Sequence, residues 1–383
     1  MNLVRFFDQS MNRNPFNLEL LCSLFSFFLV TFILCFANLA HASERGMFIW
    51  SLEEKPVLSS RQAMEKAVDF ASRHGIKTLF VQVYRSNKAW FPSKVSDTAP
   101  YRDCLKSVRE DPLAFLIKQA HAKGIEVHAW LNLLSLSGNK DAVMLKKYGP
   151  SILTRNVNPK KSLEDYKIDN QYFLEPSDSR VRHQLLLVVA ELLRGYPELD
   201  GIQFDYIRYP DVHPFYGYSP DNVARFKQAT GYKRIIDDDP AWMQWKRNQV
   251  TELLTMLVKK SRSINPRIHV STTGCLGYTR ALQEALQDWP YWLSSHLVEF
   301  VTVMNYPPDF AQYEKNIVEI KQRVKDFDRV NMAVGTYKFV HTPDIFEQQF
   351  KYCEQSGSRS CVIFHYNNFL ENDQLEKVVE QSL

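Results

Sequence analysis

The stretch Leu199–Pro210 concentrates the residues with the clearest chemical potential. It reads Leu-Asp-Gly-Ile-Gln-Phe-Asp-Tyr-Ile-Arg-Tyr-Pro, so a short apolar run over 201–204 ends in a carboxylate, a guanidinium and two phenols. Asp205 can serve in acid–base chemistry, and Arg208 can orient that carboxylate or bind an anionic group on a substrate. Parallel α/β barrels carry their catalytic groups at such strand ends, so the pattern predicts part of an active site. The alternative is a core strand whose acid and base merely pair with each other.

Hydrolysis of a glycosidic bond is the acid–base chemistry that this stretch suits, and it normally requires two carboxyl groups. Asp205 is the first candidate. Glu175, in the segment Leu-Glu-Pro-Ser, and Asp309 are candidates for the second, although each also fits a helix cap or a solvated loop acid. The chain contains no G-x-S-x-G motif, which argues against a serine hydrolase of the Ser-His-Asp type.

The rest of the chain alternates short apolar runs with helical patterns. Eight continuous apolar runs are typical of parallel strands that are buried on both faces. They lie at residues 47–50, 78–83, 125–132, 201–204, 268–273, 300–306, 331–335 and 361–366. We therefore predict one α/β domain, a (β/α)8 TIM barrel with long inserted βα loops, of which 133–179 is one. An open doubly wound sheet is the alternative, but no glycine-rich phosphate loop follows any strand, which argues against its nucleotide-binding form.

In such a barrel the carboxyl ends of the strands converge on one pocket, which predicts a set of substrate-binding side chains. Amides and aromatic rings dominate this set, and they suit the hydroxyl and acetamido groups and the flat faces of sugar rings. The predicted binding residues are Gln203, Arg208, Tyr209, Arg85, Trp130, Asn132, Asn305, Tyr306 and His365, and His128 and Thr273 belong to the same strand ends. Further stacking candidates are Trp90, Trp289 and Trp292, the last two of which equally fit helix packing.

Composition narrows the classes of partner. The chain has 383 residues, 45% of them hydrophobic, and a formal net charge of +4. No lysine- and arginine-rich block interleaves with aromatic residues, so nucleic acid is not an expected partner. The cysteines form no C-x-x-C pair and have no histidine at metal-ligand spacing, so we expect neither a metal nor another cofactor. Cys353 and Cys361 can form a disulfide in an oxidising compartment, although Cys361 also fits a plain core position.

The N-terminal residues predict export. Arg5 and Arg13 precede an apolar run over 20–37, and Ala40-His-Ala42 forms an A-x-A pattern before a polar Ser43. These features are typical of a secretory signal peptide over residues 1–42, followed by the barrel domain over 43–383. An uncleaved membrane anchor is the alternative reading, because the apolar run approaches the length that spans a bilayer. Either reading predicts a periplasmic or cell-envelope protein that contacts a membrane only if the segment is not cleaved.

A combination of motifs in this order resembles the glycosyl hydrolase-like family 10. The motifs are His128-Ala-Trp-Leu-Asn132, Leu174-Glu-Pro176, Asp200-Gly-Ile-Gln-Phe-Asp-Tyr-Ile-Arg-Tyr-Pro210, Gln287-Asp-Trp289 with Trp292, and Val303-Met-Asn-Tyr306. The resemblance covers nearly the whole chain after the leader. It implies a TIM barrel of the bacterial envelope that acts on a polysaccharide, and for some members the substrate is peptidoglycan glycan stripped of its peptides.

The segment around Asp205 also resembles the strand-four motif of chitinases, but with informative departures. Gln203 stands where chitinases have an aspartate, and Ile207 and Arg208 stand where the chitinase acid follows. The substrate-assisted mechanism of chitinases therefore does not carry over. In the Leu-Glu-Pro segment Ser177 replaces the glycine common in the resembled family.

These patterns predict an exported glycosidase that acts on peptidoglycan glycan strands or a related amino-sugar polymer, with Asp205 and Glu175 as its catalytic carboxyls. Because the second carboxyl is not marked by its own motif, a non-catalytic carbohydrate-binding protein on a degenerate hydrolase barrel is the alternative. A membrane-anchored scaffold is a third possibility, supported only by the long apolar leader.

Overall fold

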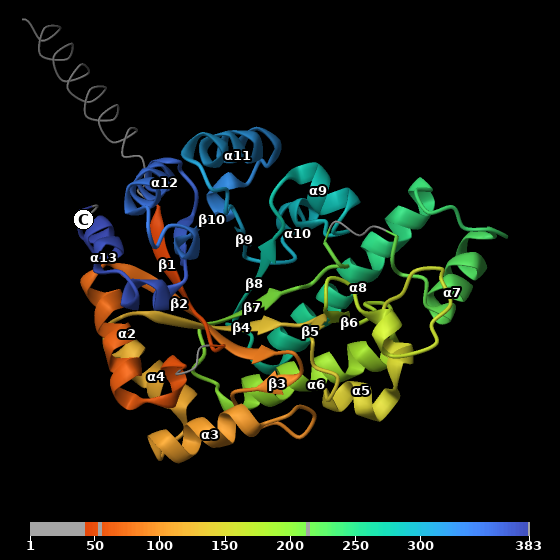
Figure 1. Cartoon of the computed structure of the whole chain (residues 1–383), viewed down its shortest axis with the longest axis horizontal. Coiled ribbons are helices and arrows are strands. Elements are labelled where there is room, and N and C mark those ends of the chain that lie inside the picture. Colours follow the sequence, from red (N-terminus) through yellow and green to blue (C-terminus); the bar gives the residue numbers. More distant parts are fainter. Residues whose placement is uncertain (1–42, 53–55, 212–214, 382–383) are drawn as a thin grey trace, which may run out of the picture. The chain divides into compact units, whose positions relative to one another are not determined.

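Eight parallel strands close into a barrel in this computed structural model, which describes residues 43–52, 56–211 and 215–381. The strands follow one another around the barrel in chain order, and β1 pairs with β2 on one side and with β11 on the other (Figure 1). The predicted (β/α)8 TIM barrel is therefore confirmed. The predicted leader and its cleavage site lie outside the described residues, except for Ser43, and Ser43–Leu383 form a single unit.

The barrel strands match the eight apolar runs of the sequence. They are β1 (Glu44–Ile49), β2 (Ile76–Arg85), β4 (Glu126–Asn132), β7 (Gly201–Asp205), β8 (His269–Gly274), β9 (Phe300–Val303), β10 (Val330–Gly335) and β11 (Ser360–Phe364). Three short strands are not part of the eight-stranded barrel. β3 (Lys88–Ala89) pairs antiparallel with β2, and β5 (Ser135–Ser137) pairs with β6 (Tyr172–Phe173).

Helices surround the strands, as Figure 1 shows. They are α2 (Arg61–Arg73), α3 (Ala99–Val108), α4 (Pro112–His121), α5 (Val143–Tyr148), α6 (Ser179–Gly195), α7 (Pro220–Thr230), α8 (Pro240–Ile264), α9 (Tyr278–Gln283), α10 (Trp289–Ser294), α11 (Phe310–Arg323), α12 (Pro343–Gln355) and α13 (Asp373–Gln381). Among the described residues, no helix is both long and apolar enough to cross a membrane.

Local sequence signals explain where the helices begin. Ser60 caps α2 by accepting a hydrogen bond from the backbone N–H of Ala63. Aspartates cap α4, α6 and α8 in the same way, and in α4 and α8 a proline occupies the first helical position. An oxygen at the cap satisfies a backbone N–H that the helix leaves free, and proline there lacks the N–H that would go unpaired. Helices α4 and α8 therefore begin at Pro112 and Pro240.

The interior of the barrel is filled by inward-pointing side chains in layers, as expected for parallel strands. Near the amino ends of the strands, His128 of β4 lies against Gly201 of β7, where a Cβ atom would come within 2.2 Å of its Nδ1. Only glycine fits this close approach. His128 is buried, and its Nε2 lies 3.3 Å from the Glu126 carboxylate. The sequence placed His128 with the residues of the barrel mouth; that was wrong, because it lies near the start of its strand.

The two long βα insertions have small structures of their own. The insertion after β4 contains β5, α5 and β6 and ends at the start of α6. The insertion after β7 leads to α7, which lies far from the strands in Figure 1. There Phe226 and Trp242 form a small apolar cluster with Tyr218. The apolar side chains of the first insertion, among them Leu134, Met144 and Leu174, belong to the main core of the barrel, whereas the second insertion has this separate cluster.

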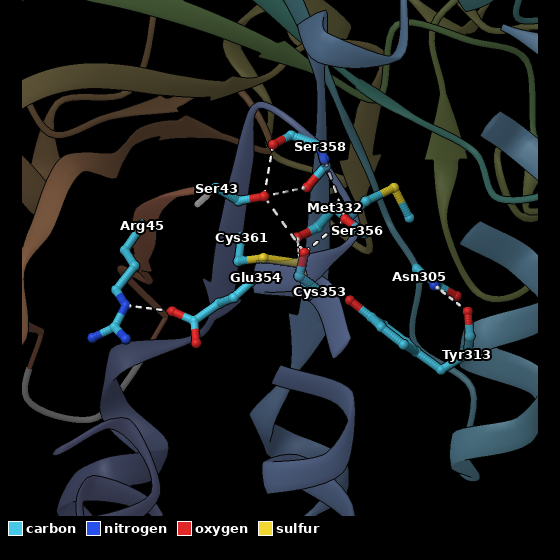
Figure 2. The surroundings of a disulfide bond; sticks show 10 residues. All are labelled: Ser43, Arg45, Asn305, Tyr313, Met332, Cys353, Glu354, Ser356, Ser358 and Cys361. Carbon is cyan, nitrogen blue, oxygen red and sulfur yellow. Dashed lines mark hydrogen bonds and ion pairs between the residues drawn. A yellow bond between two sulfur atoms is a disulfide. The ribbon is translucent and has the colours of Figure 1, made fainter. Parts of the chain in front are cut away.

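A disulfide closes the corner where α12 meets β11. It joins Cys353 to Cys361, which the sequence left as either a bridge or a core position (Figure 2). The backbone beside it is held by serine hydroxyls, since Ser43 Oγ donates to the Ser358 carbonyl at 2.7 Å and Ser356 Oγ donates to the Cys353 carbonyl at 2.6 Å. Every polar group named here has a partner within the protein, so this corner is a structural unit.

Candidate functional site

Asp205 lies at the carboxyl end of β7 and is held from three sides. Its Oδ2 accepts a hydrogen bond from the indole Nε1 of Trp130 at 3.0 Å, and its Oδ1 accepts one from Thr273 Oγ1 at 2.5 Å. The backbone N–H of Tyr206 donates to Oδ1 at 2.6 Å. The donors come from β4, β8 and the end of β7, so three strands fix the carboxylate. In all three hydrogen bonds a carboxylate oxygen of Asp205 is the acceptor, and this arrangement stabilises negative charge.

The residue after Asp205 has an unusual backbone. Tyr206 has φ of 52°, in the left-handed region that non-glycine residues rarely adopt. Such a conformation costs on the order of 1 kcal/mol and persists only where neighbouring contacts impose it. Here the hydrogen bond from the Tyr206 N–H to Asp205 helps to hold the turn. The turn allows the Tyr206 ring to lie beneath the guanidinium of Arg208, 4.8 Å from its centroid.

Arg85, at the end of β2, lies close to this carboxylate. Burial lowers the pKa of the Arg85 guanidinium, and the nearby Tyr206 and Asp205 act in the opposite direction. The guanidinium also lies over the ring of Trp50, 5.9 Å from its centroid. A half-buried cation near Asp205 is placed to balance its charge or to bind a polar group of a substrate.

Aromatic rings line the same end of the barrel, at the ends of β1, β9, β10 and β11. The Tyr306 ring lies 5.4 Å from that of Phe364 and 5.8 Å from that of Tyr337. On the other side of Phe364, the Trp50 and His365 rings meet at 4.8 Å. Flat apolar faces beside a polar group are the surfaces on which sugar rings stack. Burial lowers the pKa of His365 to about 4, so its imidazole is neutral near pH 7.

A pocket of about 440 Å³ opens among the loops that follow β7 to β10. Arg208 and Tyr306 both line it, and both are influenced by the charge of Asp205. Arg208 is only 8% exposed, and its Nη1 donates to Cys275 Sγ at 2.7 Å and to Asp211 at 3.2 Å. The sequence considered that Arg208 orients Asp205; its hydrogen bonds instead go to Cys275 and Asp211.

Gln203 lies one layer below Asp205 in the barrel interior. Its Oε1 accepts hydrogen bonds from Ser271 at 3.3 Å and Thr302 at 3.1 Å, and the side chain is completely buried. Among the described residues its Nε2 has no partner. Asn132 is also buried, and its Oδ1 accepts from Gln82 Nε2 at 2.9 Å. Gln203 thus lies beneath Asp205 in the barrel, while Asn132 lies level with Asp205 as its partner in the β4–β7 pairing.

Asn305 points away from the mouth. Its Nδ2 donates to the backbone carbonyl of Tyr313 at 3.2 Å, and its Oδ1 accepts from Asn316 at 2.8 Å (Figure 2 shows the first bond). The side chain is completely buried between the end of β9 and α11. It therefore anchors the loop that carries Tyr306, and this position accounts for the conspicuous Asn-Tyr pair.

Glu175, the second predicted catalytic carboxyl, is 0% exposed. Its Oε1 accepts from Tyr209 Oη at 2.6 Å and from Ser177 Oγ at 2.9 Å, so the structure brings together two predicted site residues away from Asp205. Burial raises the pKa of Glu175, and these hydrogen bonds act in the opposite direction. Burial likewise lowers the pKa of the nearby Lys246 to about 7. The charges of Glu175 and Asp237 act to raise this pKa, but burial has the larger effect.

The remaining candidates have structural surroundings. Trp289 and Trp292 are completely buried, and their indole N–H groups donate to the Cys275 carbonyl and to Thr251 Oγ1. Trp90 is likewise buried. Asp309 is the N-cap of α11, where its carboxylate accepts from the Gln312 N–H at 2.8 Å. Trp289 and Trp292 are therefore packing residues and Asp309 is a helix cap, as the alternatives weighed from the sequence had it.

Several residues of the site were missed from the sequence. They are Trp50, Tyr337, Phe364, Asp211, Cys275, Arg280 and Lys338. The strand-end rule could have found Trp50 and Phe364, because each lies at the carboxyl edge of a predicted strand. The other five lie in connecting segments or near the start of α9. No repeating pattern of apolar residues there indicates which way their side chains point.

One group of side chains among the described residues has ligand atoms close enough for a metal ion. It consists of His74, Glu376 and Glu380, whose ligand atoms lie within 4.8 Å of one another. Arg73 Nη1 already lies 2.9 Å from Glu376 and 4.0 Å from Glu380. This cluster lies before β2, on the face opposite to the strand ends, so it is not part of the candidate site.

Comparisons with known proteins agree with this architecture. The family model described as Glycosyl hydrolase-like 10 matches residues 44–352. The glycosyl hydrolase DigH of Escherichia coli strain K12 is 27% identical over 269 residues, which cover 65% of this chain and 58% of DigH. The glycosyl hydrolase YngK of Bacillus subtilis strain 168 is 22% identical over 218 residues, which cover 55% of this chain and 39% of YngK. The chain thus matches less than two-thirds of the length of each relative.

Solved structures share the fold at low sequence identity. The catalytic domain of β-amylase from Paenibacillus polymyxa aligns with a TM-score of 0.57 and 9% identity, over 89% of this chain and 98% of that domain. A β-galactosidase from Halorubrum lacusprofundi aligns with a TM-score of 0.57 and 11% identity, over 88% of this chain and 57% of that enzyme. These likenesses concern the TIM barrel alone. On the evidence of the family model, which matches most of its length, the chain belongs to the glycosyl hydrolase-like 10 family.

Proposed function

We propose that this protein is an exported glycoside hydrolase that cleaves O-glycosidic bonds in peptidoglycan glycan strands or a related amino-sugar polymer. The observation that carries the proposal is the Asp205 carboxylate, fixed by donors from three strand ends in a barrel of a glycosyl hydrolase-like family. Fold alone does not imply function, so the proposal rests on this site and on the family together.

The chemistry suits a carboxylate that is fixed in position. Cleavage of a glycosidic bond passes through a transition state with oxocarbenium character, in which positive charge develops on the sugar. A fixed carboxylate that faces this charge stabilises it without reorganising. Trp130 and Thr273 supply that fixation, because each donates a hydrogen bond to one oxygen of Asp205. We assign Asp205 this role and assign Glu175 a structural one. A water molecule supplies both the hydroxyl that adds to the anomeric carbon and the proton that the leaving-group oxygen takes as its bond to that carbon breaks.

The surroundings suit a sugar polymer. Tyr306, Phe364 and Trp50 present aromatic faces around the strand ends, and Arg85 adds polar donors near Asp205. Stacking and hydrogen bonding together are the usual means of holding a pyranose ring, which has polar edges and apolar faces. No cofactor is required for this reaction. The expected partner is therefore a polysaccharide or oligosaccharide.

Two observations support export. The sequence before Ser43 has the features of a secretory signal, and Cys353 is bonded to Cys361 in the folded domain. Disulfides form and persist in oxidising compartments outside the cytosol. N-terminal sequencing of the exported protein tests the leader: a start at Ser43 supports cleavage, and a retained N-terminus would indicate an anchor.

The experiment that tests the activity measures new reducing ends from purified, peptide-free glycan strands. We expect the native protein to produce them and Asp205→Asn to lose about 10²- to 10⁴-fold in rate, the usual contribution of such a group. Asp200→Asn is a matched control, because Asp200 lies beside the amino end of the same strand, where its Oδ2 accepts from the Val127 N–H at 2.8 Å and lies 2.8 Å from His121 Nε2. Binding of glycan without any product would contradict hydrolysis and favour a carbohydrate-binding protein.

A further inference from the structure

The pocket among the loops after β7 to β10 has an excess of positive charge among its lining residues. Of its lining residues, Arg208, Arg280 and Lys338 are cations and Asp211 is a carboxylate. Three cations against one carboxylate leave a net charge of +2 in a volume of about 440 Å³. A concave surface with one dominant sign of charge attracts ligands of the opposite sign.

Arg208 is built into the wall of this pocket and retains donors. Within the part of the chain that the structure describes, its side-chain hydrogen bonds leave from Nη1, to Cys275 and Asp211. A guanidinium has five N–H donors in one plane, so Nε and Nη2 remain available to an acceptor. Because Tyr206 supports the guanidinium face at 4.8 Å, the plane is held in place before a ligand arrives.

Asp211 brings the two arginines together. Its carboxylate accepts from Arg280 Nε at 3.1 Å and Nη2 at 2.5 Å, and from Arg208 Nη1 at 3.2 Å. One carboxylate cannot neutralise both guanidinium groups, so the pair keeps a positive charge. Lys338 is fixed separately, since its Nζ donates to the Tyr306 carbonyl at 2.5 Å.

The rim of the pocket suits a sugar ring. Tyr306 and Tyr337 both line the pocket, with ring centroids 5.8 Å apart and nearly perpendicular planes. Tyr337 is 43% exposed, so its ring is open to a ligand. A sugar stacked there would carry its substituents toward the arginines. A planar carboxylate matches the fork of a guanidinium better than any other common sugar substituent of single charge.

We propose that this pocket binds the carboxylate of an acidic sugar in the polymer, one whose ring stacks at Tyr306 and Tyr337. The substrate class is then a glycan with carboxylate-bearing residues. The inference rests on the proposed function for its place in the reaction, but binding can be measured without any cleavage.

The test compares two ligands that differ only in charge. One is a peptide-free peptidoglycan oligosaccharide of alternating N-acetylglucosamine and N-acetylmuramic acid, and the other is the same oligosaccharide with its lactyl carboxyls converted to amides. Titration calorimetry with Asp205→Asn measures binding while cleavage is suppressed. We expect the carboxylated ligand to bind at least about 10-fold more tightly, the effect of one charge-assisted hydrogen-bonded pair.

Variants of the pocket locate the effect. Arg280→Gln and Lys338→Gln should each weaken binding of the carboxylated oligosaccharide several-fold and leave binding of the amide unchanged. Arg102→Gln is the matched control, because Arg102 lines a different pocket, at α3 and α6, and should change neither. Thermal melting of each variant shows whether it is folded.

The outcomes separate this proposal from the proposed function. Equal affinity of the native pocket for both ligands, or equal losses for both in Arg280→Gln, would overturn the carboxylate pocket even if the protein cleaves glycan. Selective binding of the carboxylated ligand supports the pocket even if no reducing ends appear, and in that case only the hydrolase proposal fails.

Discussion

Asp205 and Glu175 are the two carboxyl groups that the sequence proposed as catalytic, and the structure places them in different kinds of environment. Asp205 is 4% exposed at the barrel mouth, where its oxygens accept hydrogen bonds from side chains of β4 and β8. Glu175 is 0% exposed near the end of the insertion after β4, where Tyr209 and Ser177 donate to one oxygen. Among the described residues its other oxygen has no partner.

The difference shows that burial alone does not mark a reactive carboxyl. Around Asp205 the donors stabilise negative charge and cationic Arg85 lies nearby. Around Glu175, desolvation dominates, so its pKa is raised and the neutral acid is favoured. A fully buried carboxyl whose hydrogen bonds lie within the insertion supports packing, whereas a carboxyl fixed at the barrel mouth is placed for chemistry.

The largest effect short of removing Asp205 should come from loosening it. Thr273→Val deletes the donor at 2.5 Å from Oδ1, and we expect kcat to fall about 10- to 100-fold, the value of one hydrogen bond to a charged group. Thr272→Val is the matched control, because Thr272 is also buried on β8 and its Oγ1 has no partner among the described residues. Equal activity of the two variants would show that the hydrogen bond from Thr273 does not contribute to catalysis.

On the Glu175 side, the next effect is a pH dependence of stability. The folded pKa of Lys246, about 7, lies below the ordinary value of 10.5, so above pH 7 the unfolded chain binds more protons than the folded one. Stability should therefore rise with pH in this window, by about 1.4 kcal/mol per unit at most. Chemical denaturation between pH 7 and about pH 9 should show this rise in the native protein and a weaker one in Lys246→Met.

Lys259→Met, on the exposed face of the same helix, is the control for this measurement and should keep the native slope. If Lys246→Met also keeps that slope, Lys246 is not the group that titrates.

A smaller effect should follow from cutting the bond between Tyr209 and Glu175. Tyr209→Phe removes the donor at 2.6 Å, and we expect a loss of about 1 kcal/mol in the free energy of unfolding, because the buried Glu175 oxygen loses one donor and keeps Ser177. Activity at 25 °C should stay close to native. Tyr313→Phe provides the comparison, since Tyr313 is also fully buried but its hydroxyl has no partner among the described residues. A greater destabilisation by Tyr313→Phe would contradict this reading.

The sequence predicted the barrel well because strands buried on both faces have continuous apolar runs, which a single sequence displays directly. It also placed Asp205 at the mouth, because side chains alternate along a strand and the strand ends at a known residue. The burial of Glu175 could not be predicted from such a pattern. Its burial depends on Tyr209 and Lys246, and on Gly217, where a Cβ atom would come within 2.8 Å of the Lys246 side chain.

Asn305 and the cationic pocket show the same limit. Asn305 was expected to bind substrate because it follows a strand, but Asn316 and the Tyr313 carbonyl, both from α11, turn it inward. Arg280 and Lys338 belong to separate connections after β8 and β10, and only the closed barrel brings them to one pocket. Positions within strands follow a period that can be predicted, whereas positions in loops depend on contacts that are distant in the sequence.

The most direct test of the comparison is the ratio of kcat/KM for Asp205→Asn and Glu175→Gln on the same peptide-free glycan strands. Glutamine has nearly the shape of the protonated acid that the raised pKa of Glu175 favours. We expect kcat/KM of Glu175→Gln to stay within about threefold of the native value. We expect kcat/KM of Asp205→Asn to fall about 10²- to 10⁴-fold with an unchanged melting temperature. A folded Glu175→Gln variant that loses as much activity as Asp205→Asn, or an Asp205→Asn variant with native activity, would contradict these expectations.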